Sequence, residues 1–369
     1  MIRHGGSGRK NRNNFRNIKI IASMSDIKRI IVTGHNGFIG ILLVKLLLKK
    51  GYQVTGIDTN YYDKDCGFYP YTPGISEIFC DIRKVNEQDI DGAYAICHLA
   101  ALSNDPMGEL NPEFTYEINH RASVRLAELA KKTGVEKFIY SSSCSLYGMA
   151  GGDTALSENA SLQPVTAYAK SKVFSERDIM PLGNKSFSVT FLRNSTAYGS
   201  SPKLRLDLVV NNLVGWAMTT GEIKIMSDGS PWRPIIHAED IARAFIAVIE
   251  ADKDVVNGQA FNTGVNSENY QIRDIANLVK EIVPGCGIVI KGEHGSDSRS
   301  YRVSFDKITS MLPDFRPVWN LRKGIEQLFS DYKRLGMDNE KFNGRYFIRL
   351  KQLQYLLQAG KINSDLYWI

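Results

Sequence analysis

The sequence predicts an α/β protein with a Rossmann-type doubly wound parallel sheet and a smaller mixed C-terminal lobe. Three observations support this expectation. Residues 28–50 read as a buried strand, a glycine-rich turn and an apolar helix. Short apolar strands then alternate with helices up to about residue 200, which implies parallel strands covered on both faces. Beyond residue 199 the alternation becomes irregular, and glycine and proline interrupt the segments.

The expected elements follow from apolar periodicity. The strands of the sheet are expected at residues 30–33, 54–57, 75–79, 95–99, 137–141 and 187–192, with the clearest helices at 112–132 and 165–180. The second lobe is expected to contain helices at residues 206–219, 238–250 and 272–282 and a strand at 223–226. Two amphipathic helices, at residues 323–335 and 345–358, are expected to pack on the second lobe or at a subunit contact.

These elements divide the chain into four parts. Residues 1–25 are rich in Gly, Asn and Arg and are expected to be a disordered or additional N-terminal extension. A translation start at Met24 and an organelle presequence are the alternatives. The Rossmann domain is expected to take residues 26–200, a mainly substrate-binding lobe 201–335, and a C-terminal helical extension 336–369.

The composition is that of an ordinary globular protein. The 369 residues are 43% apolar and 23% charged, which is enough to bury a large core. The net charge is +7, but the first 25 residues carry six Lys or Arg side chains and no acid. The rest is nearly balanced, so no nucleic-acid partner is expected. The longest apolar run, residues 38–48, contains Lys45 and is too short to cross a bilayer, so no membrane partner is expected either.

The cysteines indicate the compartment. Cys66, Cys80, Cys97, Cys144 and Cys286 are scattered and form no C-x-x-C motif. Such a pattern is typical of a reducing compartment and argues against a structural zinc site. We therefore expect a cytoplasmic protein without a metal.

The glycine-rich turn predicts a dinucleotide site. Gly34 permits a tight exit from the first strand, Gly37 lets the backbone approach a pyrophosphate, and Gly40 lets helix and strand pack closely. The N-terminus of the following helix then faces the phosphates. Asp58 ends the second strand, 21 residues after Gly37, where a carboxylate binds the ribose hydroxyls. Because an acid there repels a 2′-phosphate, NAD is favoured over NADP.

A second motif predicts the chemistry. Tyr168 and Lys172 stand at i and i+4 on a predicted helix, so that both side chains point to one face. A neighbouring ammonium group favours phenolate, so Tyr168 can remove a hydroxyl proton while the carbon loses hydride to the cofactor. Ser143 ends another strand and is expected to hydrogen-bond the same substrate oxygen. We expect Ser143, Tyr168 and Lys172 to be the catalytic residues, with Tyr168 and Lys172 also contacting the cofactor.

From residue 28 to about residue 335 the chain resembles the extended short-chain dehydrogenase/reductases of the NAD-dependent epimerase/dehydratase family, which act on nucleotide sugars. The T-G-x-x-G-x-x-G motif of that family stands here at residues 33–40 and the Ser, Tyr and Lys triad at the three positions above. The resemblance implies that NAD is bound by Gly34, Gly37, Phe38, Ile39, Gly40, Asp58, Asp81, Ile82, Leu99, Ala100, Ala101 and Asn119, with His98 on the same strand.

The resemblance also implies a substrate site. Arg233, in the segment Arg-Pro-Ile-Ile-His, is expected to meet the diphosphate, and Arg299 or Arg302 to supply a second phosphate contact. A solvated or salt-bridged arginine is the alternative for each. The family often has Asn where this chain has Thr196, so Thr196 or Asn194 is expected to make that contact. Residues 261–264, Phe-Asn-Thr-Gly, resemble a strand and turn of the second lobe.

Departures from the family narrow the reaction. Nucleotide-sugar 4,6-dehydratases carry an Asp-Glu pair directly after the catalytic hydroxyl residue, whereas this chain has Cys144 and Ser145. Neither is an effective acid at neutral pH, which makes a dehydratase improbable. Asp105 can be a second acid or base, but Asn-Asp-Pro more often forms a turn.

The leading hypothesis is an NAD-dependent nucleotide-sugar epimerase that oxidises a sugar hydroxyl transiently. The alternatives are an NAD(P)H-dependent 4-keto-sugar reductase, a UDP-glucuronate decarboxylase and a cofactor-binding regulator without turnover. The family resemblance further implies a homodimer, in which the helices at residues 112–132 and 165–180 pair across a four-helix interface.

Overall fold

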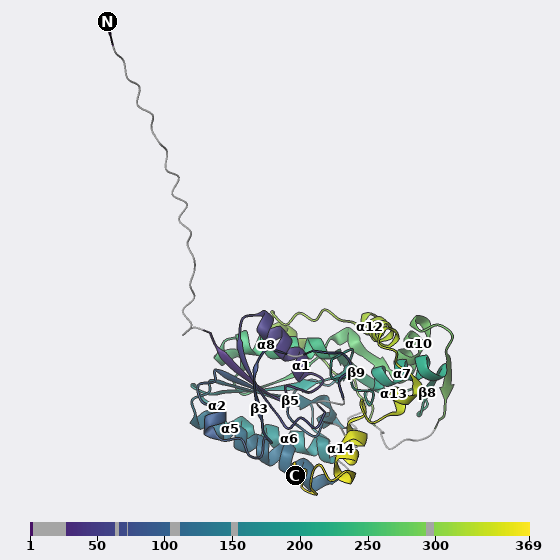
Figure 1. Ribbon diagram of the computed structural model, residues 1–369, viewed down its shortest axis with the longest axis horizontal. Helices are drawn as coiled ribbons and strands as arrows, with labels where there is room; N and C mark the ends of the chain where they lie inside the picture. Colours follow the sequence, from purple (N-terminus) through teal and green to yellow (C-terminus); the bar gives the residue numbers. More distant parts are fainter. Residues whose placement is uncertain (3–26, 63–65, 72, 104–110, 149–153, 293–298) are drawn as a thin grey trace.

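The computed structural model describes residues 1–2, 27–62, 66–71, 73–103, 111–148, 154–292 and 299–369. The expected N-terminal extension and Asp105 therefore lie almost wholly outside the described residues. Figure 1 shows a central sheet between two layers of helices, with a second lobe beside it. Among the described residues, no helix is both long and apolar enough to cross a membrane.

Seven parallel strands form the central sheet, in the order β10-β6-β5-β4-β1-β2-β3. The sheet reverses its direction of growth between β1 and β4, and in such folds ligands bind outside the carboxyl ends of the strands at this point. This confirms the predicted Rossmann-type fold. The strands are β1 Arg29–Thr33, β2 Gln53–Asp58, β3 Ser76–Phe79, β4 Ala95–His98, β5 Lys137–Ser143, β6 Ser188–Asn194 and β10 Gln259–Thr263.

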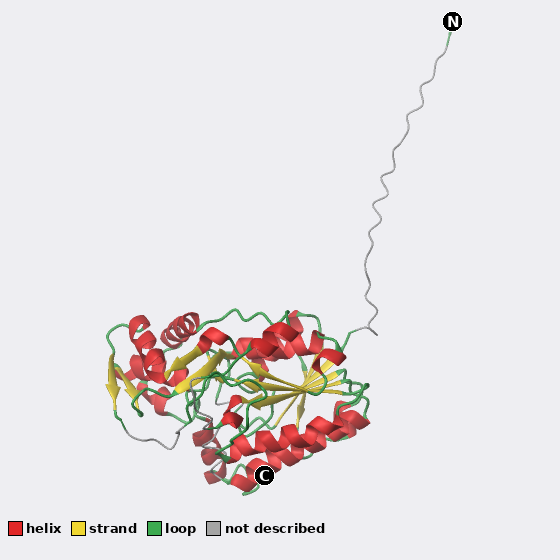
Figure 2. Cartoon of the chain, turned by 180° about the vertical axis from the view of Figure 1, so that it is seen from behind, coloured by secondary structure: helices red, strands yellow, loops and turns green. Residues whose placement is uncertain are grey.

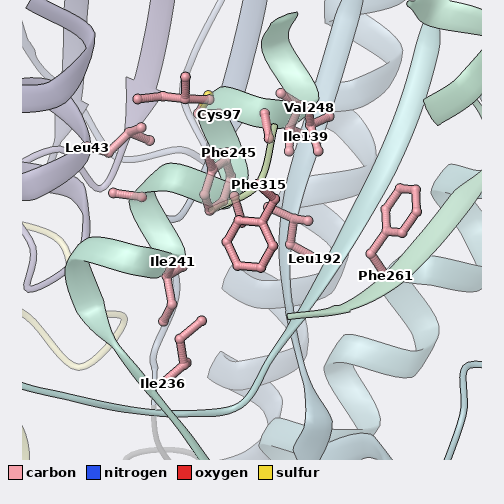
Figure 3. Packing of buried hydrophobic residues seen from close by; sticks show 14 of the residues in the cluster. Leu43, Cys97, Ile139, Leu192, Ile236, Ile241, Phe245, Val248, Phe261 and Phe315 are labelled. Atoms are coloured by element: carbon pink, nitrogen blue, oxygen red, sulfur yellow. The ribbon is translucent and has the colours of Figure 1, made fainter. Parts of the chain in front are cut away.

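Both faces of the sheet are buried, because successive side chains of each strand point to opposite sides. On β1, Ile30 and Val32 pack into the cluster beneath α1 and α8, while Ile31 packs into the cluster beneath α5. Figure 3 shows the first cluster, in which Phe245 of α8 lies against strand residues such as Leu192. These contacts explain why the strands read as continuous apolar runs.

The helices cover the two faces separately, as Figures 1 and 2 show. One face carries α1 Gly40–Lys49 and α8 Ala238–Glu250, which pack on each other. The other carries α5 Ala122–Lys132 and α6 Ala167–Ile179, with α2 Glu87–Ile90 beside α5. The predicted helix at residues 112–132 is continuous but changes type: α4 Pro112–Thr115 leads into a π-helix, η2 Tyr116–Arg121, and then into α5.

The second lobe has its own apolar core, formed mainly between three helices and two small sheets. One sheet has the order β11-β9-β7 and the other pairs β12 with β8. Its elements are β7 Thr196–Tyr198, α7 Val209–Thr220, β8 Glu222–Ile225, β9 Trp232–His237, β11 Asn269–Gln271, α10 Ile272–Ile282 and β12 Gly287–Ile290. Two short helices contact the central sheet, α9 Lys253–Val256 at β6 and α11 Asp306–Met311 at β10.

The chain crosses between the lobes more than once, which corrects the sequence-based assignment of residues 261–264. These residues were expected in the second lobe, but Phe261 to Thr263 lie in β10 at the edge of the central sheet, paired with β6. Helix α8 also covers that sheet. A single boundary at residue 200 therefore does not separate the two lobes. The chain enters the second lobe after residue 200 and then returns to the central sheet to form α8 and β10.

The C-terminal helices pack in two different places. Helix α12 Leu321–Arg334 packs on α7 and α10 in the second lobe, as expected. Helix α13 Asn339–Asn343 also contacts α7. In contrast, α14 Arg349–Gln358 and the last residues pack in a cluster with Tyr61, Ile82, Leu102 and Ile118 of the nucleotide-binding half. The expectation that this helix packs on the second lobe is therefore wrong, since apolar periodicity does not identify the surface that a helix covers. The alternative, a subunit contact, stays a prediction.

Candidate active site

A cleft of about 1180 Å³ lies at the carboxyl ends of the strands, where the two lobes meet. It brings together residues that are widely separated in the sequence. Among the predicted site residues, the cleft is lined by Gly34, Gly37, Phe38, Ile39, Gly40, Asp58, Asp81, Ile82, Leu99, Ala100, Ala101, Ser143, Tyr168, Lys172, Asn194, Thr196, Arg233 and Arg299.

The glycine turn forms a cradle that side chains would fill. Gly34 has a positive φ of 72°, and a Cβ there would lie 2.8 Å from the backbone nitrogen of Ala100. A Cβ on Gly40 would lie 2.1 Å from the carbonyl oxygen of Gly34. The turn is held closed by hydrogen bonds from the Gly34 amide to the Ile57 carbonyl and from the Gly37 amide to the Gly34 carbonyl. Helix α1 begins directly behind it, with no side-chain cap, so its first amides face the cleft.

Asp58 is fixed at the end of β2 by the neighbouring backbone. Its Oδ2 accepts a hydrogen bond from the Asn36 amide at 3.1 Å, and its Oδ1 accepts one from the Asn60 amide at 2.9 Å. Each carboxylate oxygen retains a second lone pair for a ribose hydroxyl. The cradle and this acid fit the adenosine half of NAD.

Asp81 sits beside the same end of the cleft but is already paired. Arg83 binds it in a bidentate manner, with Nε to Oδ1 at 3.0 Å and Nη2 to Oδ2 at 2.7 Å. The guanidinium of Arg83 also lies 3.8 Å from the ring centroid of Tyr367, near the C-terminus. Only the carboxylate lone pairs that do not accept from Arg83 are therefore available on Asp81 for the cofactor.

Asn119 acts from below the cleft, and it is not among the residues that line it. Its amide group donates to the Leu102 carbonyl at 3.0 Å and accepts from the Leu102 amide at 2.8 Å. This fixes the loop after β4 along the cofactor path. Asn119 lies in the π-helix, and its carbonyl accepts hydrogen bonds from the hydroxyls of Ser123, Tyr140 and Ser175.

The predicted catalytic residues converge at the far end of the cleft. Ser143 ends β5, and its Oγ accepts a hydrogen bond from the Ser145 amide at 3.1 Å, so its O–H is free to donate to a substrate oxygen. Tyr168 and Lys172 lie in the first turns of α6, which begins after the cap Thr166. The Lys172 Nζ lies 5.6 Å from the centroid of the Tyr168 ring and donates to the Ser141 carbonyl at 2.7 Å.

The surroundings of Lys172 alter its acidity. Burial lowers the pKa of Lys172 to about 7, although the nearby carboxylate of Glu176 favours the charged form. Glu176 is itself held by a buried ion pair with Arg193, at 2.7 Å between Nη2 and Oε2. His98 is kept neutral, because burial and the charge of Lys172 lower its pKa to about 3. His98 therefore adds no positive charge beside Lys172.

Cys144 does not face the substrate. Its thiol lies in the core and donates to the Arg193 carbonyl at 3.1 Å, and burial raises the pKa of Cys144 to about 12. Ser145 lines the cleft, but a hydroxyl is no acid at neutral pH. The two positions that hold carboxylates in dehydratases therefore hold no acid or base here.

The predicted substrate residues are only partly brought together. The Asn194 amide donates to Ser141 Oγ at 3.0 Å, and its Oδ1 has no hydrogen-bond partner among the described residues. Arg233 is buried on β9 and donates to the Trp232 and Arg299 carbonyls. Arg302 is not among the described residues that line the cleft, since its guanidinium lies 5.1 Å from the Trp232 ring centroid. Its expected phosphate contact is therefore withdrawn in favour of Arg299.

Sequence reasoning missed four charged residues in the cleft, Arg205, Asp207, Lys224 and Arg349. A signal for the first two was present, because charged and apolar residues alternate from Lys203 to Asp207. No signal pointed to Arg349, which reaches the cleft from α14, more than 140 residues further along the chain.

The chain is similar in sequence and fold to known proteins. The sequence pattern of the NAD dependent epimerase/dehydratase family matches residues 30–264. UDP-glucose 4-epimerase of Mycolicibacterium smegmatis is 30% identical over 252 residues, covering 65% of this chain and 78% of the relative. UDP-glucuronate 4-epimerase of Thermodesulfobacterium geofontis is 26% identical over 318 residues, covering 80% of this chain and 94% of the relative. The solved structure of MoeE5 in complex with UDP-glucuronic acid and NAD is 26% identical and superposes with a TM-score of 0.73, covering 83% of this chain and 99% of that one.

The protein is thus an NAD-dependent enzyme of the extended short-chain dehydrogenase/reductase type. It belongs to the NAD-dependent epimerase/dehydratase family, which confirms the resemblance seen in the motifs.

Proposed function

We propose that this enzyme inverts a hydroxyl-bearing carbon of a nucleotide sugar, with NAD retained through the turnover. The observation that carries the proposal is the convergence of Ser143, Tyr168 and Lys172 on one cleft with the glycine cradle and Asp58. The epimerase relatives and the nucleotide-sugar complex described above support it.

The chain's own residues supply the proton transfer. When bound, NAD supplies the acceptor that takes a hydride from the sugar carbon and later returns it. Tyr168, as a phenolate beside the Lys172 ammonium, accepts the hydroxyl proton, and Ser143 donates a hydrogen bond to the same oxygen. After the keto sugar presents its other face, Tyr168 returns the proton to the oxygen. Atoms and electrons balance, and no net oxidant is consumed.

The cleft is large enough for a cofactor and a nucleotide sugar together and is poorly suited to elimination. Its volume of about 1180 Å³ exceeds that of most small-ligand sites. The absence of an acid or base at Cys144 and Ser145 disfavours loss of water.

The proposal is tested by incubating purified protein with UDP-, GDP-, CDP- and dTDP-sugars without added cofactor, and following products by NMR. We expect interconversion of one pair of epimers. A steady requirement for NAD(P)H would indicate a keto-sugar reductase, and release of carbon dioxide a decarboxylase. NAD released from the denatured protein would show that the cofactor was bound. If that protein nevertheless converted none of the sugars, the result would count against epimerisation and favour a cofactor-binding regulator without turnover.

We propose further that the enzyme is a homodimer and acts in the cytoplasm. Half-buried aromatic side chains, Tyr116 and Phe174, lie on the outer side of the η2 and α6 helices, with ring centroids 5.9 Å apart, where a second copy would cover them. All five cysteines are free thiols, which suits a reducing compartment. Light scattering should give twice the chain mass of 41.3 kDa, and cell fractionation should place the protein with cytoplasmic markers. A monomer at micromolar concentration would contradict the first expectation.

A further inference from the structure

The side chain of Arg349 enters the cleft from the C-terminal segment. Arg349 is the first residue of α14, is only 3% exposed, and lines the cleft. Its Nη2 donates to the Lys203 carbonyl at 2.9 Å, and its guanidinium lies 4.3 Å from the ring centroid of Tyr62. Its Nη1, however, is buried and has no hydrogen-bond partner among the residues that the structure describes. A buried cationic N–H group without an acceptor is costly, which points to an acceptor supplied by a ligand.

A second buried arginine lies beside it. Arg205 pairs with Asp207 through two hydrogen bonds, of 3.0 Å and 2.8 Å, and donates to Ser103 Oγ at 3.1 Å. A guanidinium carries five N–H groups, so these three hydrogen bonds leave N–H groups of Arg205 that can donate to a ligand. Two guanidinium groups face the single carboxylate of Asp207, and Lys203 adds a third cation, whose Nζ donates to the Tyr62 carbonyl. This corner of the cleft therefore carries more buried positive than negative charge.

The pKa values agree with two cations in close proximity. Burial lowers the pKa of Arg349, and the charge of Arg205 lowers it further. Burial also acts to lower the pKa of Arg205. The carboxylate of Asp207 outweighs this effect, and with smaller contributions from Tyr62 and Tyr168 it raises the pKa of Arg205 above its usual value. Both side chains stay charged at neutral pH, as arginine does in proteins.

Arg205 connects this corner to the catalytic end of the cleft. It donates to Ser103 Oγ, in the loop that follows β4, and its charge acts on Tyr168, the residue that would meet the reacting hydroxyl. Arg233 and Arg299, the residues expected to meet the diphosphate, come from β9 and the segment that follows β12. The two sets of arginines thus belong to different elements and serve different parts of one ligand.

We propose that Arg349 and Arg205 form a subsite for a carboxylate on the sugar, so that the substrate is a nucleotide sugar of the uronate class. This inference rests on the proposed function and specifies its substrate. A carboxylate is planar and accepts two parallel hydrogen bonds from a guanidinium, so it satisfies the free Nη1 and neutralises the excess charge together. Because Arg349 lies beyond residues 30–264, the part that the family pattern matches, this half of the subsite is an addition of the C-terminal segment.

Calorimetry on the Tyr168→Phe variant, which holds NAD but cannot turn over, tests the subsite. The ligands are UDP-glucuronate, UDP-glucose and UDP. We expect UDP-glucuronate to bind at least about 30-fold more tightly than UDP-glucose. The neutral sugar has no carboxylate, so it leaves the buried guanidinium of Arg349 without an anionic partner. Adding Arg349→Gln should weaken UDP-glucuronate binding by a similar factor and change binding of UDP-glucose and UDP by less than about threefold.

Arg322→Gln is the matched control, because Arg322 is a half-exposed surface arginine that pairs with Glu281 far from the cleft. It should leave all three affinities unchanged. Equal binding of the acidic and neutral sugars, or an equal loss for both on Arg349→Gln, would overturn the proposal. Where Arg349→Gln fails to fold, as judged by circular dichroism and lost NAD, the comparison of the two sugars on the Tyr168→Phe protein decides alone.

The failures of the two proposals are distinguishable. If the wild-type enzyme interconverts neutral sugars and shows no preference for the uronate, the subsite is wrong and the epimerase function stands. If UDP-glucuronate binds selectively but no epimer forms, the subsite stands and the reaction is wrong. Carbon dioxide measured in the same samples identifies decarboxylation.

Discussion

At the scale of single residues, the phenol of Tyr168 depends on an amine that the fold has made unusually acidic. Lys172 is almost fully buried, and its Nζ is satisfied by the Ser141 carbonyl and by the face of the Tyr140 ring, 4.5 Å from its centroid. Because burial lowers the pKa of Lys172 to about 7, this amine titrates near neutral pH. A group with that property can adjust the charge on a neighbouring phenol within the physiological range.

Replacing Tyr168 with Phe should abolish proton transfer without disturbing the cofactor site. We expect turnover to fall by about 10²- to 10⁴-fold, the usual contribution of a positioned acid or base. NAD content, measured after denaturation, should stay the same. The matched control is Tyr346→Phe, at an exposed tyrosine outside the cleft, which should keep full activity. Wild-type turnover in Tyr168→Phe would contradict the mechanism.

The pKa of Lys172 makes stability depend on pH in a defined direction. Its pKa is about 7 in the folded protein and near 10.5 unfolded, so between these values the unfolded chain binds the extra proton. The free energy of unfolding of the wild type should therefore rise from pH 7 toward pH 10, relative to Lys172→Met. Thermal melts of both proteins at pH 6, 7, 8 and 9 measure this. A difference that stays constant over the series would show that Lys172 is not titrating there.

At the scale of elements, the turn between β1 and α1 fixes how closely the helix approaches the sheet and the cofactor. The Gly34 carbonyl lies where any side chain on Gly40 would begin, so strand, turn and helix fit only with glycine at this position. The π-helix η2 has a comparable role on the other face, because the Asn119 carbonyl within it accepts hydrogen bonds from three side-chain hydroxyls. Both elements position the cleft through backbone geometry.

Gly40→Ala should be severely destabilising. The added methyl would lie 2.1 Å from a backbone oxygen, which cannot move without opening the turn, so we expect a loss of about 3 kcal/mol or more in the free energy of unfolding. Gly287→Ala is the control, because a Cβ there meets nothing within 4 Å. Urea unfolding of both variants gives the comparison. Equal stabilities would mean that the turn relaxes more easily than the structure indicates.

At the scale of the whole molecule, the C-terminal segment ties the two lobes to the cofactor loop. Helix α14 inserts Arg349 into the cleft, and the residues after it close over the loop that follows Asp58. The Trp368 indole donates to the Thr59 carbonyl at 2.7 Å, the Tyr61 hydroxyl donates to the Leu366 carbonyl, and Arg83 stacks on Tyr367. Figure 1 shows α14 beneath the sheet, beside α6.

Removing residues 360–369 should therefore weaken NAD binding as well as stability. Ile362 and Leu366 are buried, and losing them should lower the melting temperature by about 5 °C or more. NAD affinity should fall by about tenfold, because the loop that carries Asp58 loses its cover. Val318→Ala, at an exposed apolar residue elsewhere, controls for general effects. Unchanged NAD affinity in the truncated protein would show that the segment only adds stability.

The sequence by itself determined the sheet, the glycine cradle, the ribose acid and the Ser, Tyr and Lys set. These features depend on spacing within one strand, turn or helix, so local periodicity and residue chemistry are enough to reveal them. The tertiary structure alone decided that β10 returns to the sheet edge, that Arg299 rather than Arg302 lines the cleft, and that Arg349 joins Arg205 inside it. Those placements depend on packing between segments far apart in the chain, and such contacts leave no local pattern in the sequence.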